Sequence, residues 1–208
     1  MLSKHTSNII FLLFIFVLTS SITTAQIKIG LNVGANLAEY KVDGNTGSSE
    51  FSKRTGLSIG AISEYQISKR ISVRLNAGYI QSGGKIINPL FGNFENTVSF
   101  DYVQLSPFIT YKVINSKIFA KIIGGFSFGH LVNAKVNSQG IDTNIKDNFY
   151  LLNIASNFGL EIEKTISPKT SLILSGIYSI GLKNISKYGS NIKTSDININ
   201  VGFLYNLY

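Results

Sequence analysis

The chain has 208 residues, which suits a single domain, and 44% of them are hydrophobic. Because it contains no cysteine, we expect no disulfide bonds, no thiolate metal site and no lipid anchor on cysteine. A formal net charge of +8 would favour nucleic acid as the partner of a cytosolic protein, but in an exported protein it favours anionic lipid headgroups.

The first 25 residues have the pattern of an export signal. Lys4 lies in a short polar start, and an unbroken apolar run, IIFLLFIFVL, covers residues 9–18. This run is too short to cross a bilayer as a helix. The small residues that follow predict cleavage after Ala25, so that residues 1–25 form the signal peptide and residues 26–208 form the mature domain.

From residue 26 onward, apolar and polar residues alternate. In the first such segment Ile27, Ile29 and Leu31 are separated by Lys28 and Gly30. A period of two is typical of strands with one apolar and one polar face, and its recurrence predicts eight strands and no helix. The predicted strands are residues 26–37, 56–66, 71–81, 98–112, 118–132, 151–164, 171–182 and 196–208.

The connecting segments alternate between long and short. Long polar segments follow the first, third and fifth strands, and a medium one follows the seventh, whereas tight turns follow the second, fourth and sixth. This pattern predicts an up-and-down meander with long loops at one end and tight turns and both termini at the other. The longer segments are residues 38–54, 82–97, 133–148 and 183–195, and the turns centre on residues 68–70, 115–117 and 167–168.

An even number of strands, with short turns at one end and long loops at the other, is the layout of an outer-membrane barrel. Only helices and closed barrels satisfy every backbone polar group in hydrocarbon, and no helix is predicted here. The sequence therefore predicts an all-β fold, an eight-stranded antiparallel up-and-down transmembrane β-barrel in the cell outer membrane.

The alternative is a soluble, secreted eight-stranded barrel, in which the apolar residues would face inward. The composition of the two faces favours the membrane barrel. Aromatic residues such as Tyr79, Tyr178 and Phe203 fall on the apolar phase, as aromatic girdles require, and many glycines fall on the polar phase, where small residues allow a narrow lumen to fill. These glycines are Gly30, Gly34, Gly56, Gly60, Gly78, Gly125, Gly129, Gly159 and Gly202.

Four stretches of the mature chain resemble strands of a known family. They are LNAGYIQSGGK at residues 75–85, FDYVQLSPFITYK at residues 100–112, IFAKIIGGFSFGHLVNAK at residues 118–135 and IYSIGLKNI at residues 177–185. Together they are similar to the small outer-membrane β-barrels of Bacteroidota, known as PorT-like or porin-family barrels. The resemblance implies an eight-stranded outer-membrane barrel, and it implies no single activity because fold does not determine function.

Five charged residues within the predicted strands fall on the polar, lumen-facing phase near the tight-turn end. One interpretation is an ion or proton gate, and the other is a buried salt-bridge network that closes a lumen only wide enough for side chains. We favour the network, because three cations nearly balance two anions and an unpaired buried charge would cost several kcal/mol. The five residues are Lys28, Glu64, Arg74, Lys121 and Glu161.

The sequence offers little for catalysis, and we predict no enzyme activity, no catalytic residues, no cofactor and no metal site. His130, the one histidine after residue 25, is expected near the loop end of the fifth strand on the lipid-facing phase. A lipid-modifying enzyme that uses His130 is the less favoured alternative, since no serine or carboxylate has a suggestive spacing from it. Asp142 and Asp147 are expected to be solvated loop residues.

Basic residues flank the three predicted tight turns. They could face the phosphates of the inner leaflet, or they could simply keep the turns soluble. The expected partners are outer-membrane phospholipid and lipopolysaccharide, with no nucleic acid, and the long loops could bind a protein partner. The basic residues are Lys69, Arg70, Lys112, Lys117, Lys164 and Lys169, and Glu163 is the one acidic residue beside them.

These features predict a structural or interaction role, either in membrane integrity or in binding through the long loops, with the lumen closed by polar side chains. The alternative is narrow, porin-like transport of small solutes. An eight-stranded barrel has little room for an aqueous channel, which favours the first interpretation.

Pro107 interrupts the fourth predicted strand, on the phase assigned to lipid. A closed barrel has no edge strand on which a proline could avoid the hydrogen-bond ladder. We therefore predict a β-bulge or local widening at Ser106 to Phe108, where the unpaired carbonyl of the neighbouring strand turns toward the lumen.

Overall fold

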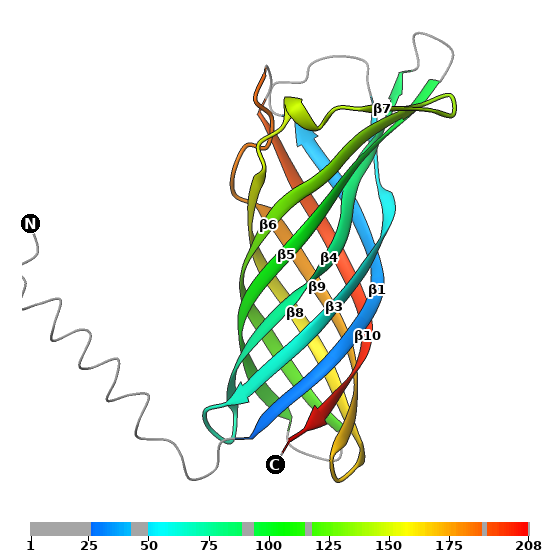
Figure 1. Cartoon of the computed structure of the whole chain (residues 1–208). Coiled ribbons are helices and arrows are strands. Elements are labelled where there is room, and N and C mark those ends of the chain that lie inside the picture. Colours follow the sequence, from blue (N-terminus) through cyan, green and yellow to red (C-terminus); the bar gives the residue numbers. More distant parts are fainter. Residues whose placement is uncertain (1–25, 43–49, 89–93, 115–117, 189–190, 208) are drawn as a thin grey trace, which may run out of the picture.

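The computed structural model describes residues 26–42, 50–88, 94–114, 118–188 and 191–207. The predicted signal peptide and the predicted turn at residues 115–117 lie outside these ranges. Eight long antiparallel strands form a barrel (Figure 1). They are β1 (Ile27–Val42), β3 (Arg54–Gln66), β4 (Ile71–Asn88), β5 (Phe94–Ile114), β6 (Ile118–Ser138), β8 (Leu152–Ser167), β9 (Thr170–Gly181) and β10 (Ile192–Asn206).

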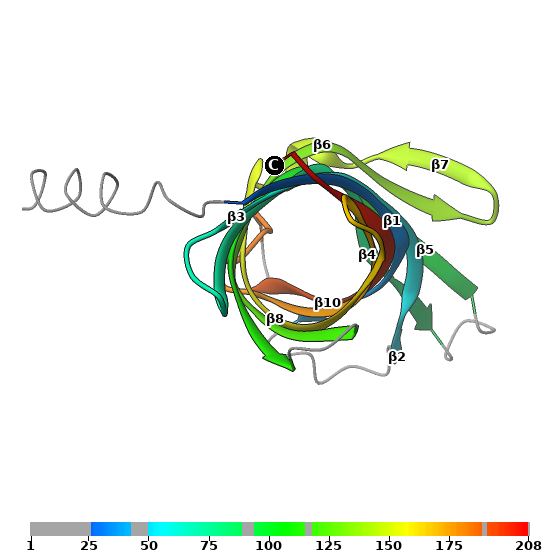
Figure 2. The same cartoon turned by 90° about the horizontal axis from the view of Figure 1, so that it is seen from below.

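The sheet closes on itself, as the end-on view makes plain (Figure 2). Each long strand pairs with the long strands before and after it in the sequence, and β1 pairs with β10 from Lys28 opposite Asn206 to Val42 opposite Ile192. The N-terminal end of β1 and the C-terminal end of β10 both lie at the tight-turn end of the barrel (Figure 1). The predicted eight-stranded up-and-down barrel is confirmed.

The two faces of the barrel differ as the alternation predicts. Leu31, Ile59 and Leu160 point outward and are more than half exposed, whereas Ser58 and Asn157 point inward and are buried. A soluble barrel would have the opposite arrangement, because the burial of apolar side chains away from water is the main term that drives folding in water. The polar lumen and apolar exterior therefore favour the membrane barrel over the soluble alternative.

The segments predicted as long loops contain more β-structure than expected. β4 and β5 continue pairing as far as Asn88 opposite Phe94, and β6 returns through Gln139 and Gly140, both with positive φ, into the short strand β7 (Ile141–Asn144). These extensions carry polar residues on both faces, so alternation of hydrophobicity cannot mark them.

Two further short elements lie at the long-loop end. β2 (Glu50–Ser52) pairs with β4, and a single 3-10 turn, η2 (Lys146–Asn148), follows β7. Figure 1 shows β7 projecting beyond the barrel wall at this end. Within the described part of the chain, no helix is long and apolar enough to cross a membrane.

Of the two alternatives predicted at Pro107, a β-bulge or a local widening, the bulge is absent, but the ladder with β6 is interrupted there. On one side Pro107 lies opposite Leu75 in an unbroken ladder with β4. On the other side the pairs of Ser106 and Pro107 with β6 are missing from the ladder, but the register is the same before and after the gap. The proline therefore removes a hydrogen bond without adding a residue, because the neighbouring pairs hold the two strands in place.

Register shifts do occur in the same pair of strands, but at its two ends. One lies between Asp101 and Tyr102, and the other lies between Lys112 and Ile114. Bulges of this kind change which side chains face inward and increase local twist. On β6 the alternation of inward-facing residues is offset by this first shift, so that Leu131 and then Ala134, three residues later, face inward.

We predict that two glycines on opposite faces respond differently to substitution by alanine. A Cβ at Gly78 would lie 2.3 Å from the Ile59 carbonyl oxygen, whereas a Cβ at Gly176 would meet nothing within 4 Å. Gly78→Ala should lower the free energy of unfolding by roughly 1–3 kcal/mol through overpacking. Gly176→Ala should leave it unchanged or raise it by up to about 1 kcal/mol.

Urea unfolding in phospholipid vesicles, followed by circular dichroism, measures both values. Equal destabilisation by the two variants would contradict the assignment of Gly78 to the crowded inner face and Gly176 to the open outer face.

Candidate functional site

Five charged residues meet inside the barrel near the tight-turn end. They come from five strands, with Lys28 on β1, Glu64 on β3, Arg74 on β4, Lys121 on β6 and Glu161 on β8. Strand register sets their depth, because Glu64 lies opposite both Lys28 and Arg74, and Lys121 lies opposite Glu161. The structure therefore brings all five of the residues singled out in the sequence into one cluster.

Arg74 is the centre of this cluster. Its Nε donates to Glu64 Oε2 at 2.7 Å, and its Nη1 and Nη2 donate to the two carboxylate oxygens of Glu161 at 2.6 Å each. Lys121 Nζ lies 2.9 Å from Glu64 Oε1 and 3.4 Å from Glu161 Oε1. These four side chains are at most 3% exposed, so the ion pairs lie in a poorly solvated interior.

Glu163 is a sixth member, although its position near a tight turn in the sequence predicts that it belongs with the turn-flanking residues. Its side chain is fully buried, and its two oxygens lie 2.7 Å from Lys28 Nζ and 2.6 Å from Lys121 Nζ. The strand period was the available signal, because Glu163 is two residues after Glu161 and must share its face. We call these six residues the lumen charge network.

The lumen charge network is electrically balanced. With Glu163 included, three cations face three carboxylates, and each carboxylate is within ion-pair distance of at least two cationic side chains. Burial of an unpaired ion would cost several kcal/mol. Complete pairing therefore allows large charged side chains to fill the cross-section of a narrow barrel.

A small polar cavity lies next to the network on its long-loop side. Its volume is about 70 Å³, and its lining includes Asn32, Asn76, Asn157 and Asn200. Ser58 Oγ, also in the lining, donates to Asn200 Oδ1 at 2.6 Å. Amide and hydroxyl groups in this layer can bind water, and they carry no net charge.

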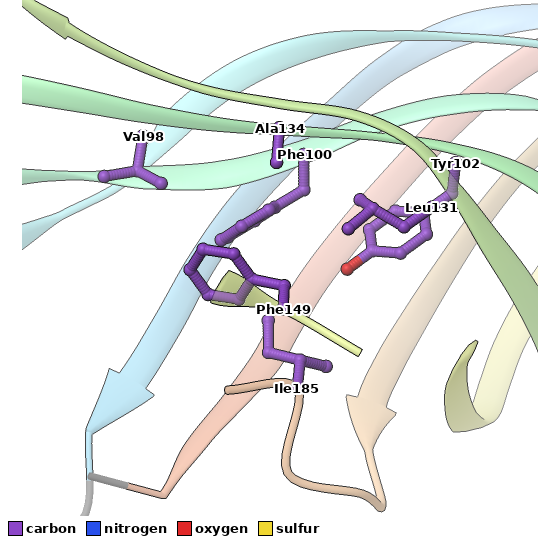
Figure 3. Packing of buried hydrophobic residues seen from close by; sticks show 7 residues of the cluster. All are labelled: Val98, Phe100, Tyr102, Leu131, Ala134, Phe149 and Ile185. Carbon is purple, nitrogen blue, oxygen red and sulfur yellow. The ribbon is translucent and has the colours of Figure 1, made fainter. Parts of the chain in front are cut away.

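An apolar cluster packs together at the long-loop end of the barrel (Figure 3). Phe149 packs edge-on against Phe100, with ring centroids 4.7 Å apart and an interplanar angle of 70°. Its seven buried members, which we call the apolar plug, are Val98, Phe100, Tyr102, Leu131, Ala134, Phe149 and Ile185.

Two members of the apolar plug come from segments between the barrel strands. Phe149 follows η2 and Ile185 follows β9, and the two segments are joined by the bridge between Phe149 and Ser186. Tyr150 N donates to Ile185 O at 2.8 Å, and Ile185 N donates to Ile192 O at 2.9 Å. These hydrogen bonds hold the two segments across the end of the lumen.

The expectation that polar side chains close the lumen is therefore incomplete. Charged residues fill it at the tight-turn end, whereas at the long-loop end the apolar plug is accompanied by buried polar residues that include Asn36, Ser82 and Asp196. A sequence signal exists in β5, where Val98, Phe100 and Tyr102 are apolar on the inward phase while Val103 and Leu105 are apolar on the outward phase. A strand that is apolar on both faces indicates burial on both sides.

Lys112, one of the basic residues predicted to flank the tight turns, lies inside the barrel. Lys112 is opposite Lys121 in the register of β5 and β6, and Lys121 points into the lumen, so both share the inner face. Lys112 Nζ lies 4.3 Å above the centre of the Phe119 ring. By contrast, Lys164 is exposed on the outer phase, opposite Leu172.

His130 lies on the outer face, where the alternation placed it. It is exposed, and its cross-strand neighbours are Val103 and Leu152. Among the described residues, no hydrogen bond or ion pair to the imidazole is present. The described residues also contain no group of three or more His, Cys, Asp or Glu side chains arranged to hold a metal ion.

Comparison with known families identifies the barrel. Residues 20–187 match the family described as the outer membrane protein beta-barrel domain. The chain belongs to this family. The match ends before β10, which closes the barrel by pairing with β1 and β9. No curated protein matches the chain.

Solved outer-membrane barrels have a similar fold. OprG from Pseudomonas aeruginosa has a TM-score of 0.56 at 12% identity, over 88% of this chain and 95% of that chain. A major outer membrane protein from Thermus thermophilus has a TM-score of 0.51 at 10% identity, over 88% and 100%. The outer membrane protease OmpT from Escherichia coli has a TM-score of 0.50 at 12% identity, over 92% and 100%.

Membership of the outer-membrane β-barrel family places the protein in the outer membrane and confirms the predicted localisation. The similarities to solved structures, at 10–12% identity, concern the fold alone. The apolar exterior of the barrel therefore faces lipid, and the lumen charge network and apolar plug lie within the protein.

We predict that Glu161→Gln destabilises the outer-membrane barrel far more than Glu95→Gln. Loss of the Glu161 charge leaves Arg74 underpaired in a buried site, which should lower the free energy of unfolding by about 3–5 kcal/mol. Glu95 pairs with Lys85 at 2.7 Å, but its side chain is 45% exposed, so Glu95→Gln should cost less than about 1 kcal/mol.

Both variants remove one negative charge from ion pairs with strand residues, and the two sites differ in burial and in the number of cationic partners. Unfolding by urea in phospholipid vesicles gives the two free energies. The interpretation of the network as a buried structural element would be wrong if Glu161→Gln and Glu95→Gln shifted the midpoint equally.

Proposed function

We propose that the protein is a closed outer-membrane barrel with a structural or interaction role, in membrane integrity or in binding through its long-loop end, and that it conducts no solutes. The observation that supports this role is the double closure of the lumen. An ion or solute entering from either side would meet the apolar plug or the lumen charge network.

The two closures oppose the passage of solutes for different energetic reasons. The apolar plug excludes ions and polar solutes, because it offers too few hydrogen-bonding groups to replace their hydration. The lumen charge network presents ion pairs that would have to separate, which leaves uncompensated buried charges. Neither closure depends on the other for its contacts.

We further propose that the protein is not an enzyme. The one histidine of the described chain, His130, lies on the outer surface between Val103 and Leu152, with no described carboxylate or hydroxyl bonded to it. A general base needs a hydrogen-bonding partner that orients it. The carboxylates of the lumen charge network, which could act as acids or bases in an open site, are all engaged in ion pairs.

The long-loop end supports a role in binding. Ile141 in β7 and Tyr188 after β9 are exposed by 70% and 73%, and exposed apolar and aromatic side chains on projecting segments are typical of interaction surfaces. The tight-turn end instead presents basic residues such as Lys69 and Arg70, and we propose that these contact anionic lipid phosphates.

Two finer assignments belong to this proposal. We infer that residues 1–25 are removed as a signal peptide and that residues 26–208 form the mature barrel. We also infer, from the four stretches described above, that the chain is one of the small PorT-like barrels of Bacteroidota, with outer-membrane phospholipid and lipopolysaccharide as its surroundings.

We expect proteoliposomes that contain the protein to swell in isotonic arabinose no faster than protein-free liposomes. Phe149→Ala, which opens the apolar plug, should also remain impermeable, because the lumen charge network still fills the tight-turn end. Swelling in proportion to the amount of wild-type protein would contradict the proposal and favour narrow porin-like transport.

Binding at the long-loop end is tested with a tagged protein recovered from native outer membranes. We expect components that copurify with the wild type to be lost from Ile141→Ser/Tyr188→Ser and retained with Thr143→Ser, a neighbouring exposed change in β7. Equal recovery with all three proteins would exclude these loop residues from binding and favour the role in membrane integrity.

A further inference from the structure

A second cavity opens at the tight-turn end, on the other side of the lumen charge network from the polar cavity. Its volume is about 210 Å³, and we call it the vestibule. Its lining includes the inward-facing ends of β1, β3, β5, β8 and β10, together with the turn before β9. Among its lining residues are Lys28, Lys112, Lys169, Phe119, Ser171 and Asn206.

The lining of the vestibule is strongly basic. It contains three lysines and no carboxylate. Lys28 is paired with Glu163, but no carboxylate of the described residues lies within 4.0 Å of Lys112 or Lys169. Because the adjoining network is itself neutral, these two lysines give the described lining of the vestibule an excess positive charge.

The position of Lys112 differs from that of an ordinary surface lysine. Its side chain is half-buried on the inner face and rests on the Phe119 ring at 4.3 Å. Contact with an aromatic face holds an ammonium group in place but does not neutralise it. A cation held at a concave surface with low-dielectric walls attracts counter-ions more strongly than one on an open surface.

We propose that the vestibule binds a phosphate group. A phosphomonoester carries a charge of about −1.5 to −2 at neutral pH and three acceptor oxygens, which matches the excess positive charge of the lining. The hydroxyl of Ser171 and the amide of Asn206 add polar groups to the lining. The phosphate can come from a soluble monoester in the adjoining compartment or from a lipid whose headgroup is a phosphomonoester and reaches around the rim of the barrel.

Binding is tested by calorimetric titration of glycerol 3-phosphate into the full mature barrel in non-ionic detergent, in a phosphate-free buffer of low ionic strength. We expect a saturable heat with one site per barrel. Lys112→Gln/Lys169→Gln should weaken binding by roughly tenfold or more, since charge-assisted hydrogen bonds dominate anion recognition.

Lys164→Gln is the matched control, because it removes the same charge at the same end of the barrel but from the outer face. It should leave the affinity unchanged. Lys169→Gln alone provides a second variant in an exposed turn, where substitution leaves the strands intact and should still weaken binding. Absence of a saturable heat, or equal weakening by Lys164→Gln and Lys112→Gln/Lys169→Gln, would overturn the proposal.

The source of the phosphate is distinguished by repeating the titration in lipid nanodiscs. If a lipid headgroup is the ligand, phosphatidic acid nanodiscs should abolish the glycerol 3-phosphate heat that phosphatidylcholine nanodiscs preserve. If the ligand is soluble, the affinity should be the same in both. A vestibule that binds no phosphate would leave the closed-barrel proposal intact, because closure depends on the network and not on Lys112 or Lys169.

Discussion

The bidentate contact of Arg74 with Glu161, across the lumen, is the interaction on which the rest of the interior depends. A transmembrane barrel must turn its apolar side chains outward, so its polar side chains are confined to a space too narrow for bulk water. An unpaired charge buried in that space would cost several kcal/mol, which favours ion pairs there. Arg74 has five donors in a planar fork, and it can therefore bind Glu64 from the neighbouring strand and Glu161 from the opposite wall at the same time.

The two ends of the lumen are closed by different chemistry because different parts of the chain are available there. At the tight-turn end the connections are short, so only strand residues can fill the interior, and long charged side chains span it. At the long-loop end the connecting segments fold back and supply Phe149 and Ile185. Apolar side chains in this position need no partner with fixed geometry, which suits segments held by only a few hydrogen bonds.

Much of the barrel follows from the sequence because period-two alternation determines which face each residue occupies. The eight strands, the closed topology and the five lumen charges could be predicted, since all of them depend on local pattern. The inward position of Glu163 was not predicted, because its closeness to a turn was given more weight than its place in the strand alternation. Phe149 and Ile185 could not be assigned, since their burial depends on contacts between segments far apart in the chain. Pro107 disturbed the ladder less than expected because the pairs on either side of it keep the register.

The vestibule and the closed lumen are consistent with each other electrostatically. An anion attracted by Lys112 and Lys169 next meets a layer that contains Glu64, Glu161 and Glu163 as well as its cations, and no cation there is free to accept a new partner. Moving further would require Lys28 to leave Glu163, which is fully buried and would then lose one of its two cationic contacts. A positive mouth beside a neutral, fully paired layer can hold an anion at the surface of the barrel while preventing its passage.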